Sequence, residues 1–266
     1  MANPDVLRNH PDTINPYQVA WRIFRSRLRW DRNPVARDSR KKIAAWRDRY
    51  QGQRAVVLCN GPSLLKSDLD LLSGTFTFGL NKINLLYEKS RFRPSCIVAV
   101  NKLVLEQNRD FYNETETPLF LDTVALKVGI NNAAHTHFLH HVDHRRFARD
   151  CSMSIFQGYT VTYVALQLAF HMGFLEVALI GADHYFSTPG PPNQTVTSEA
   201  SDPNHFDPQY FAGGVQWQLP DLPESELSYI TARDVFSAFG RRVVNATEGG
   251  HLEIFERESL ETFVKD

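Results

Sequence analysis

The sequence predicts an α/β protein built on a doubly wound, mainly parallel β-sheet. Short apolar runs alternate with segments of helical period from residue 54 onward, which is typical of sequential β-α units. The runs are continuously apolar, as expected for strands covered on both faces. Several runs also end in Asn or Asp followed by a turn, so polar groups are expected at the carboxyl ends of the strands.

Each element has a local justification. The β-branched run at 54–58 predicts a strand that ends in the tight turn Asn-Gly-Pro-Ser, with an amphipathic helix at 64–72. Helices at 159–172 and 224–239 are expected to end at Gly173 and Gly240, because glycine readily ends a helix. The remaining apolar runs predict strands at 75–80, 95–100, 118–122, 135–140, 176–182 and 241–245.

Composition narrows the function classes. With 266 residues and 42% hydrophobic content, the chain can bury one large core. A net charge of −1 gives no general attraction to nucleic acid, so no nucleic-acid partner is expected. The cysteines Cys59, Cys96 and Cys151 are too widely spaced for a disulfide framework or a zinc site. No apolar run reaches the ~18 residues of a membrane span, and no signal-peptide core is visible, so we expect a cytoplasmic protein.

Residues 1–50 are predicted to form a basic helical N-terminal arm, and residues 51–266 a catalytic domain. Between Arg22 and Arg54 the chain has twelve Lys or Arg against three Asp. In the segment 17–30, Trp21, Phe24 and Leu28 share one helical face. This face fits peripheral contact with an acidic bilayer at the inner face of the membrane. It fits equally a helix that packs on its own domain, which is the favoured interpretation.

The turn after the first predicted strand is a candidate anion site. Gly61 allows a sharp turn, and Pro62 and Ser63 suit the first turn of a helix, whose free N–H groups attract phosphate or carboxylate. The turn matches neither G-x-G-x-x-G nor G-x-x-x-x-G-K-[ST], the two common phosphate loops. A plain connection between strand and helix is an equally open interpretation.

Polar residues at strand ends predict a shared binding crevice. In doubly wound sheets, ligands bind beyond the carboxyl ends of the strands. An uncharged amide offers both a donor and an acceptor to sugar hydroxyls, base edges and phosphate oxygens. The residues that follow or end predicted strands are Asn60, Asn81, Asn101, Asp183 and Asn245.

Residues 185–223 are predicted to form a long lid. The segment is rich in Pro, Gly, Ser and Asn and lacks a helical or strand period, which is typical of functional lids or of disorder. Its second half contains His205, Phe206, Tyr210, Phe211 and Trp217, which is too aromatic for disorder.

These motifs resemble the 6-hydroxymethylpterin diphosphokinase-like family and the related small bacterial sialyltransferases that use CMP-sialic acid. The resemblance covers about residues 54–255. It is carried by Asn60-Gly-Pro-Ser63, by the strand ends Asn81 and Asn101, by the run from Gly173 to Tyr185, and by Asn204-His-Phe206. The segments 159–169 and 240–250 are typical of the broader family. The resemblance implies a Rossmann-like fold of the glycosyltransferase variant, without a bound metal.

The resemblance also implies roles. Asn60 and Asn81 would contact the CMP phosphate and sugar, and Asn101 the nucleotide side of the pocket. Tyr185 would hydrogen-bond the departing phosphate, and His205 would act as general base on the acceptor hydroxyl. The matching segments extend the candidate binding set to Thr160, Thr162, His184, Gly249 and Gly250.

Two departures stand out. Cys59 occupies a position where glycine is usual in the family. The sialyltransferases have a second tyrosine that 187–190 lacks, and Tyr210 is its candidate replacement.

The expected function is therefore transfer of an acidic sugar, sialic acid or a related nonulosonate, from a CMP-activated donor to a glycan, polysaccharide or lipid-linked acceptor. An ATP-dependent diphosphokinase remains an alternative, and it would require Mg²⁺, with Asp183 as the best ligand candidate. A metal hydrolase that uses His135, His137, His140, His141 and His144 is a second alternative. A non-catalytic nucleotide-binding protein is a third, and oligomerisation stays open.

Overall fold

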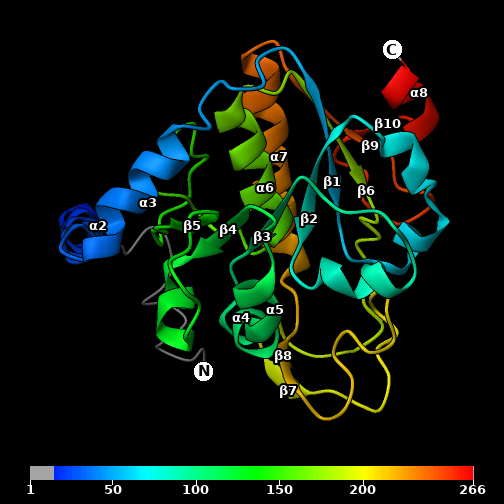
Figure 1. Ribbon diagram of the computed structural model, residues 1–266, viewed down its shortest axis with the longest axis horizontal. Helices are drawn as coiled ribbons and strands as arrows, with labels where there is room; N and C mark the ends of the chain where they lie inside the picture. Colours follow the sequence, from blue (N-terminus) through cyan, green and yellow to red (C-terminus); the bar gives the residue numbers. More distant parts are fainter. Residues whose placement is uncertain (1–14, 266) are drawn as a thin grey trace, which may run out of the picture.

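The structure is a computed structural model that describes residues 15–265. Its centre is a sheet of eight strands in the order β10-β9-β6-β1-β2-β3-β4-β5, and every neighbouring pair is parallel (Figure 1). The predicted α/β, doubly wound, Rossmann-like fold class is confirmed. The strands are β1 (Arg54–Leu58), β2 (Phe76–Leu80), β3 (Cys96–Ala99), β4 (Leu119–Asp122), β5 (Thr136–Leu139), β6 (Glu176–Ile180), β9 (Arg242–Asn245) and β10 (Glu256–Arg257).

The sheet is buried on both faces, which explains its continuously apolar strands. In β1, Val57 joins one apolar cluster while Val56 and Leu58 join the other, because successive side chains point to opposite faces. Helix α6 (Val161–Met172) is almost entirely buried, and it packs on the first face beside α7 (Leu222–Ala238) (Figure 1). The second cluster contains side chains from short elements: η2 (Pro62–Lys66), η3 (Leu69–Leu72), η4 (Ile83–Glu88), α4 (Lys102–Gln107), α5 (Arg109–Glu114), η5 (Thr123–Val128) and α8 (Leu260–Lys265).

Helices α2 (Pro16–Asp31) and α3 (Pro34–Ala44) lie at the β5 edge of the sheet, and α8 lies at the opposite edge (Figure 1). The Ser39 hydroxyl is 2.6 Å from the Phe138 backbone nitrogen and 3.0 Å from its carbonyl oxygen, so α3 satisfies part of the edge strand. Ser26 of α2 lies 3.1 Å from Nε2 of His140, whose ring stacks on Trp30. The helical nature of this segment was predicted.

The apolar stripe of α2 faces away from the domain, whereas the favoured interpretation placed it against the domain. Helix α2 packs on the domain through the face that bears Trp30, whereas Trp21 is 59% exposed, Phe24 53% and Leu28 38%. The helix has two apolar faces because Val19, Ile23 and Trp30 repeat at helical spacing on the side turned away from Trp21. Within residues 15–265 there is no helix that is both long enough and apolar enough to span a bilayer.

Other differences concern short elements. The helix predicted at 64–72 is wrong: the segment forms two 3₁₀ turns, η2 and η3, separated by Ser67 and Asp68, whose backbones are extended. The lid contains an antiparallel pair that the sequence did not indicate, β7 (Thr195–Thr197) with β8 (Gln216–Gln218). These strands are three residues long, too short to leave a visible hydrophobic period.

Candidate functional site

A cavity of about 510 Å³ lies beyond the carboxyl ends of β1, β2, β3 and β6. After β5 the chain crosses back through α6 to place β6 beside β1, so the strand order reverses at this point. Such a switch point leaves a crevice between the loops that leave the two adjacent strands. The lid covers the same end of the sheet (Figure 1).

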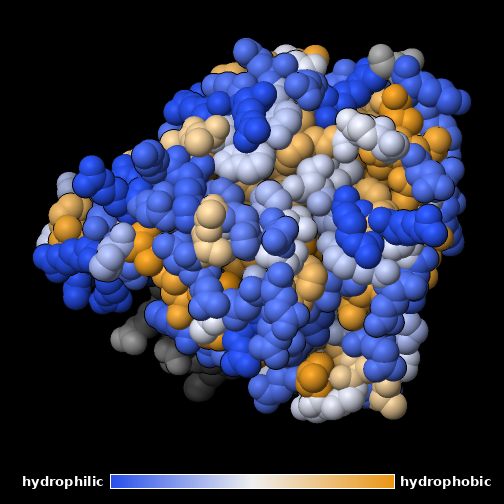
Figure 2. Space-filling model, in the orientation of Figure 1, coloured by the Kyte–Doolittle hydropathy of each residue, from blue (hydrophilic) through white to orange (hydrophobic). Residues whose placement is uncertain are grey.

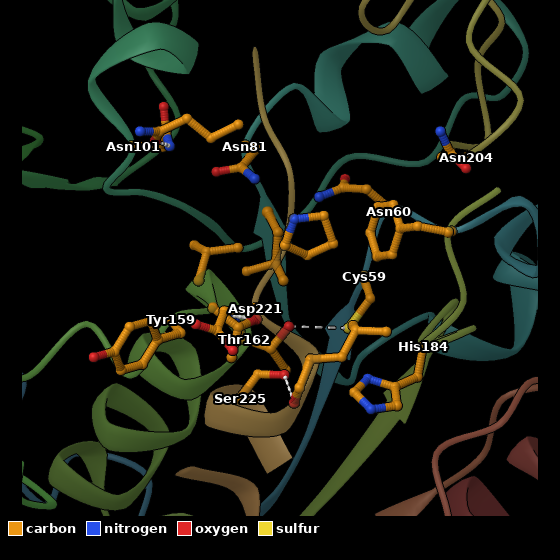
Figure 3. A pocket seen from close by; sticks show the side chains of 18 of the residues that line it. Cys59, Asn60, Asn81, Asn101, Tyr159, Thr162, His184, Asn204, Asp221 and Ser225 are labelled. Carbon is orange, nitrogen blue, oxygen red and sulfur yellow. Dashed lines mark hydrogen bonds between the residues drawn. The ribbon is translucent and has the colours of Figure 1, made fainter. Parts of the chain in front are cut away.

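Two asparagines that line this cavity have side chains that are not fully hydrogen-bonded. The Oδ1 atoms of Asn60 and Asn81 are buried and have no hydrogen-bond partner in residues 15–265. Both residues line the cavity, and Figure 3 shows them on the side where Asn101 also lies. A buried amide without a partner costs about 1–3 kcal/mol, so a polar ligand that supplies the missing hydrogen bonds is favoured there.

The other strand-end and helix-start residues are already engaged. The Asn101 side chain accepts hydrogen bonds from the backbone of Leu103 and Val104, and its amide donates to Gln218 of the lid at 3.0 Å. Thr160 accepts from the Thr162 backbone and so caps α6. The Thr162 hydroxyl lies 3.5 Å from the Cys59 sulfur, and burial raises the pKa of that thiol to about 12. These residues shape the cavity wall (Figure 3).

The predicted anion site at the Asn-Gly-Pro-Ser turn is occupied by the protein itself. Oδ2 of Asp183 accepts from the Ser63 hydroxyl at 2.6 Å and from the Ser63 backbone N–H at 3.2 Å. Pro62 and Ser63 do not line the cavity. The free N–H groups that the sequence suggested for phosphate therefore serve to hold β6 against β1, although Gly61 and Asp183 still form part of the cavity wall.

Gly61 is required by this contact. A Cβ at position 61 would lie 1.9 Å from Oδ2 of Asp183 and 2.7 Å from the Gly181 carbonyl oxygen. We expect Gly61→Ala to lower the free energy of unfolding by about 1–3 kcal/mol, measured by urea denaturation. In the double variant Gly61→Ala/Asp183→Ala the loss should be smaller than the sum of the two single losses. An unchanged urea midpoint for Gly61→Ala would contradict the contact.

His205 is held by a carboxylate at the roof of the cavity. Its Nδ1 lies 2.7 Å from Oδ2 of Asp202, and its ring stacks on Tyr210 with centroids 4.1 Å apart. The adjacent Phe206 N–H donates to the Asn60 carbonyl at 2.9 Å, which fastens this part of the lid to the end of β1. Burial raises the pKa of Asp202, but hydrogen bonds from His205 and the Asn204 backbone outweigh it, so the pKa is lowered overall. Asp202 is therefore charged at neutral pH and orients the imidazole.

Tyr210 does not reach the cavity. It is fully buried and lies outside the cavity lining, so its phenol is not placed where the predicted catalytic role needs it. Its carbonyl accepts from Nζ of Lys82 at 2.6 Å, and Gln107 accepts from the same amine at 2.7 Å. Burial lowers the pKa of Lys82 to about 8. Tyr210 thus packs the lid on the sheet and supports the His205 ring.

Three further candidates are structural. The Asn245 amide donates to the Leu252 carbonyl at 2.8 Å, and its Oδ1 accepts from the Thr247 backbone N–H. Both ends of the side chain are therefore hydrogen-bonded within the turn after β9. Gly249 and Gly250 also lie outside the cavity lining. A Cβ at Gly250 would meet the Asp183 backbone at 3.0 Å, which indicates close packing of two loops. The structure therefore gives these residues packing and turn contacts outside the cavity in which their binding roles were predicted.

The predicted lid tyrosine Tyr185 lines the cavity and is 60% exposed, with its ring against His251. Its neighbour His184 also lines the cavity, and its Nε2 lies 2.9 Å from Glu226. His184 has a φ of 53°. Five described non-glycine residues have positive φ, and four of them line the cavity: Asn81, Tyr159, His184 and Asn193. Such backbone strain concentrates at functional sites.

Some lining residues were missed by sequence analysis. They include Asp143, Gln157, Tyr159, Asn193, Trp217, Gln218 and Asp221. The only signal for Tyr159 was its place just before Thr160, because a left-handed tyrosine cannot be recognised in the sequence. The lining contains no Lys or Arg among the described residues, and its acidic side chains are Asp143, Asp183 and Asp221.

The described part of the chain holds no group of three or more His, Cys, Asp or Glu arranged to bind a metal. Three of the five histidines of the alternative hydrolase site, His137, His140 and His141, are engaged within the protein. Nε2 of His137 accepts from the Trp46 indole at 2.9 Å, and Nδ1 of His140 lies 2.9 Å from the Ser154 hydroxyl. Nδ1 of His141 lies 2.5 Å from Asp122, and this hydrogen bond raises the pKa of His141.

Comparison with known proteins finds similarity in structure and none in sequence. No protein-family model and no curated protein sequence matches the chain. A solved structure, the MAf glycosyltransferase from Magnetospirillum magneticum AMB-1, is similar with 12% identity and a TM-score of 0.48. The match covers 85% of this chain and 38% of that chain.

Proposed function

We propose that the cavity binds a nucleotide-activated sugar and that the protein transfers this sugar to a hydroxyl group of an acceptor. The observation that carries the proposal is the pair of unpartnered Asn60 and Asn81 amide oxygens in a cavity that His205, held by Asp202, also lines. The amides can bind ribose hydroxyls, base edges or phosphate oxygens without adding charge. The cavity at the switch point has the size of a small-molecule site, for which ~300–1,000 Å³ is typical.

His205 acts as the general base in the proposed reaction. In the proposed tautomer, Nδ1–H of His205 donates to Asp202, which leaves the lone pair of Nε2 to act as the base. As the acceptor oxygen bonds to the anomeric carbon, Nε2 takes the hydroxyl proton, and the bond from that carbon to the phosphate oxygen breaks. Tyr185 is the proposed donor to the departing phosphate, because a phenol can stabilise the growing negative charge without a cation.

The proposed donor is a CMP-linked acidic sugar, sialic acid or a related nonulosonate, and the proposed acceptor is a glycan, polysaccharide or lipid-linked glycan. This finer assignment rests on the sequence resemblance to the sialyltransferases. The lining without Lys or Arg requires the nucleotide phosphate to be bound through amides, hydroxyls and backbone N–H groups. The proposed reaction requires no metal ion or other cofactor.

Nucleotide binding tests the proposal. We expect CMP or CDP to raise the melting temperature, because a ligand at a hundred times its Kd stabilises the fold by about 2.7 kcal/mol. Asn60→Asp and Asn81→Asp keep the side-chain shape but place a carboxylate beside the phosphate, so either substitution should abolish the shift. The matched control Asn131→Asp lies on the exposed surface and should keep it.

Two results would contradict the proposal. A shift with ATP that depends on Mg²⁺ and disappears in EDTA would instead favour the diphosphokinase reaction. Equal shifts for the parent protein, Asn60→Asp and Asn81→Asp would show that nucleotides bind outside this cavity.

A further inference from the structure

Helix α2 carries a second surface that the proposed reaction does not use. Tyr17, Trp21, Phe24 and Leu28 recur at helical spacing, and they are 84%, 59%, 53% and 38% exposed. The stripe runs about 16 Å along the helix, given a rise of ~1.5 Å per residue. In Figure 2 the projecting left end of the molecule, where α2 lies, shows apolar surface among strongly hydrophilic residues.

One flank of the stripe is strongly basic. Helical spacing places Arg22, Arg25 and Arg29 along this flank, and Arg32 follows at the carboxyl end. All four arginines are exposed, and none forms an ion pair within residues 15–265. Arg27 and Asp31, on the other side of the helix, pair with each other at 3.0 Å.

The opposite face of α2 holds the helix rigidly on the domain. Trp30 is buried, its ring stacks on His140, and the Ser26 hydroxyl lies 3.1 Å from the same histidine. Asn15 caps the amino end of the helix by accepting from the Tyr17 and Gln18 backbone. The exposed stripe is therefore preformed and turned away from the domain.

We propose that α2 docks the protein on an anionic lipid bilayer. Trp and Tyr prefer the headgroup level of a membrane, Phe and Leu enter the acyl boundary, and arginine pairs with anionic headgroups. A second copy of the chain would bring another cationic flank instead. In an antiparallel pairing of two stripes, arginine flank faces arginine flank, so charge complementarity favours the bilayer.

Vesicle flotation with the full chain tests this docking. We expect the protein to float with phosphatidylcholine vesicles that contain phosphatidylserine, and to stay unbound with phosphatidylcholine alone or at high salt. Blue-shifted tryptophan emission should accompany binding, because Trp21 is the most exposed of the four tryptophans. The variants Trp21→Ser/Phe24→Ser and Arg22→Gln/Arg25→Gln/Arg29→Gln should each bind at least about tenfold more weakly.

Matched controls carry the same chemistry at other sites. Leu227→Ser on α7 removes an exposed apolar side chain, and Lys66→Gln/Arg91→Gln/Arg109→Gln removes three exposed charges. Both should bind vesicles as the parent protein does, and all variants should keep the parent circular dichroism and melting temperature. Binding that the stripe variants leave unchanged, or no binding by the parent protein, would overturn the proposal. A dimer in solution that Trp21→Ser/Phe24→Ser dissociates would overturn it as well, in favour of self-association.

Discussion

Replacement of His205 by glutamine is expected to lower the rate of sugar transfer by about 10²–10⁴-fold, the usual contribution of a positioned general base. The amide of glutamine retains a polar group but cannot take up the acceptor proton at neutral pH. CMP binding should persist, because Asn60 and Asn81, which we assign to the nucleotide, are untouched. The measurement is CMP release from CMP-sialic acid with and without glycan acceptors, alongside the CMP-induced melting shift.

Asp202→Asn separates positioning from proton transfer. The substitution keeps the side-chain size but removes the charge that orients His205 through Nδ1. We expect a smaller loss of rate than for His205→Gln and a changed pH profile of kcat/KM, since the carboxylate no longer stabilises the protonated imidazole. Gln209→Ala, an exposed change in the same lid, should leave the rate unaltered. Full transfer activity in His205→Gln would show that the imidazole is not the general base.

Seven of the eight strands were predictable because each carries its own signal, whereas β10 consists of the two exposed charged residues Glu256 and Arg257 and was not predicted. Continuous β-branched runs, glycine stops after α6 and the alternation of strand with helix are all local features. The crevice followed from topology alone: parallel strands deliver their end residues to one edge, and Asn60, Asn81, Asn101 and Asp183 all line one cavity.

The state of each side chain was not predictable. Asn245 also ends a strand, yet its amide is consumed by the Leu252 and Thr247 backbone, and a sequence cannot distinguish this turn from an open site. Asp183 occupies the anion site of a loop 120 residues earlier in the chain, a contact that exists only after folding. Tyr210 and His205 stack in the lid, but only packing decides that the tyrosine is buried and the histidine lines the cavity.

Acidification from pH 6.5 to pH 4 is expected to destabilise the protein through two buried histidines. Burial lowers the pKa of His137 and of His140 to about 4, from the ordinary value of 6.5. Between pH 6.5 and pH 4 the unfolded chain therefore binds protons that the folded chain does not, and stability falls as pH falls. Each of these two histidines should remove up to about 3 kcal/mol of stability across that window.

The geometry explains why these imidazoles stay neutral. Nδ1 of His137 lies 2.9 Å from the Leu119 carbonyl, so it carries the proton, and Nε2 must accept from the Trp46 indole. A second proton on Nε2 would face that indole N–H and break the link between the segment after α3 and the sheet. Lys42 near His137 and Arg27 near His140 lower the pKa in the same direction as burial, whereas Asp122 partly opposes it at His140. His141 has the opposite sign, because its raised pKa gives stability that is fully present below pH 6.5 and is lost at higher pH.

Urea denaturation at a series of pH values between 7 and 4 measures this effect. We expect the free energy of unfolding to fall as the pH falls, with a slope that corresponds to nearly two protons. The total free energy of unfolding of a protein is typically about 5–15 kcal/mol, so this loss is a large part of it. His140→Gln should lower stability at pH 7, since it disturbs the contacts to Ser26 and Ser154, but reduce the slope by about one proton. The exposed control His144→Gln should leave the stability and the slope unchanged. A flat profile down to pH 4 would mean that His137 and His140 are accessible to water. It would then also contradict the contacts of these two residues that hold α2 and α3 on the sheet.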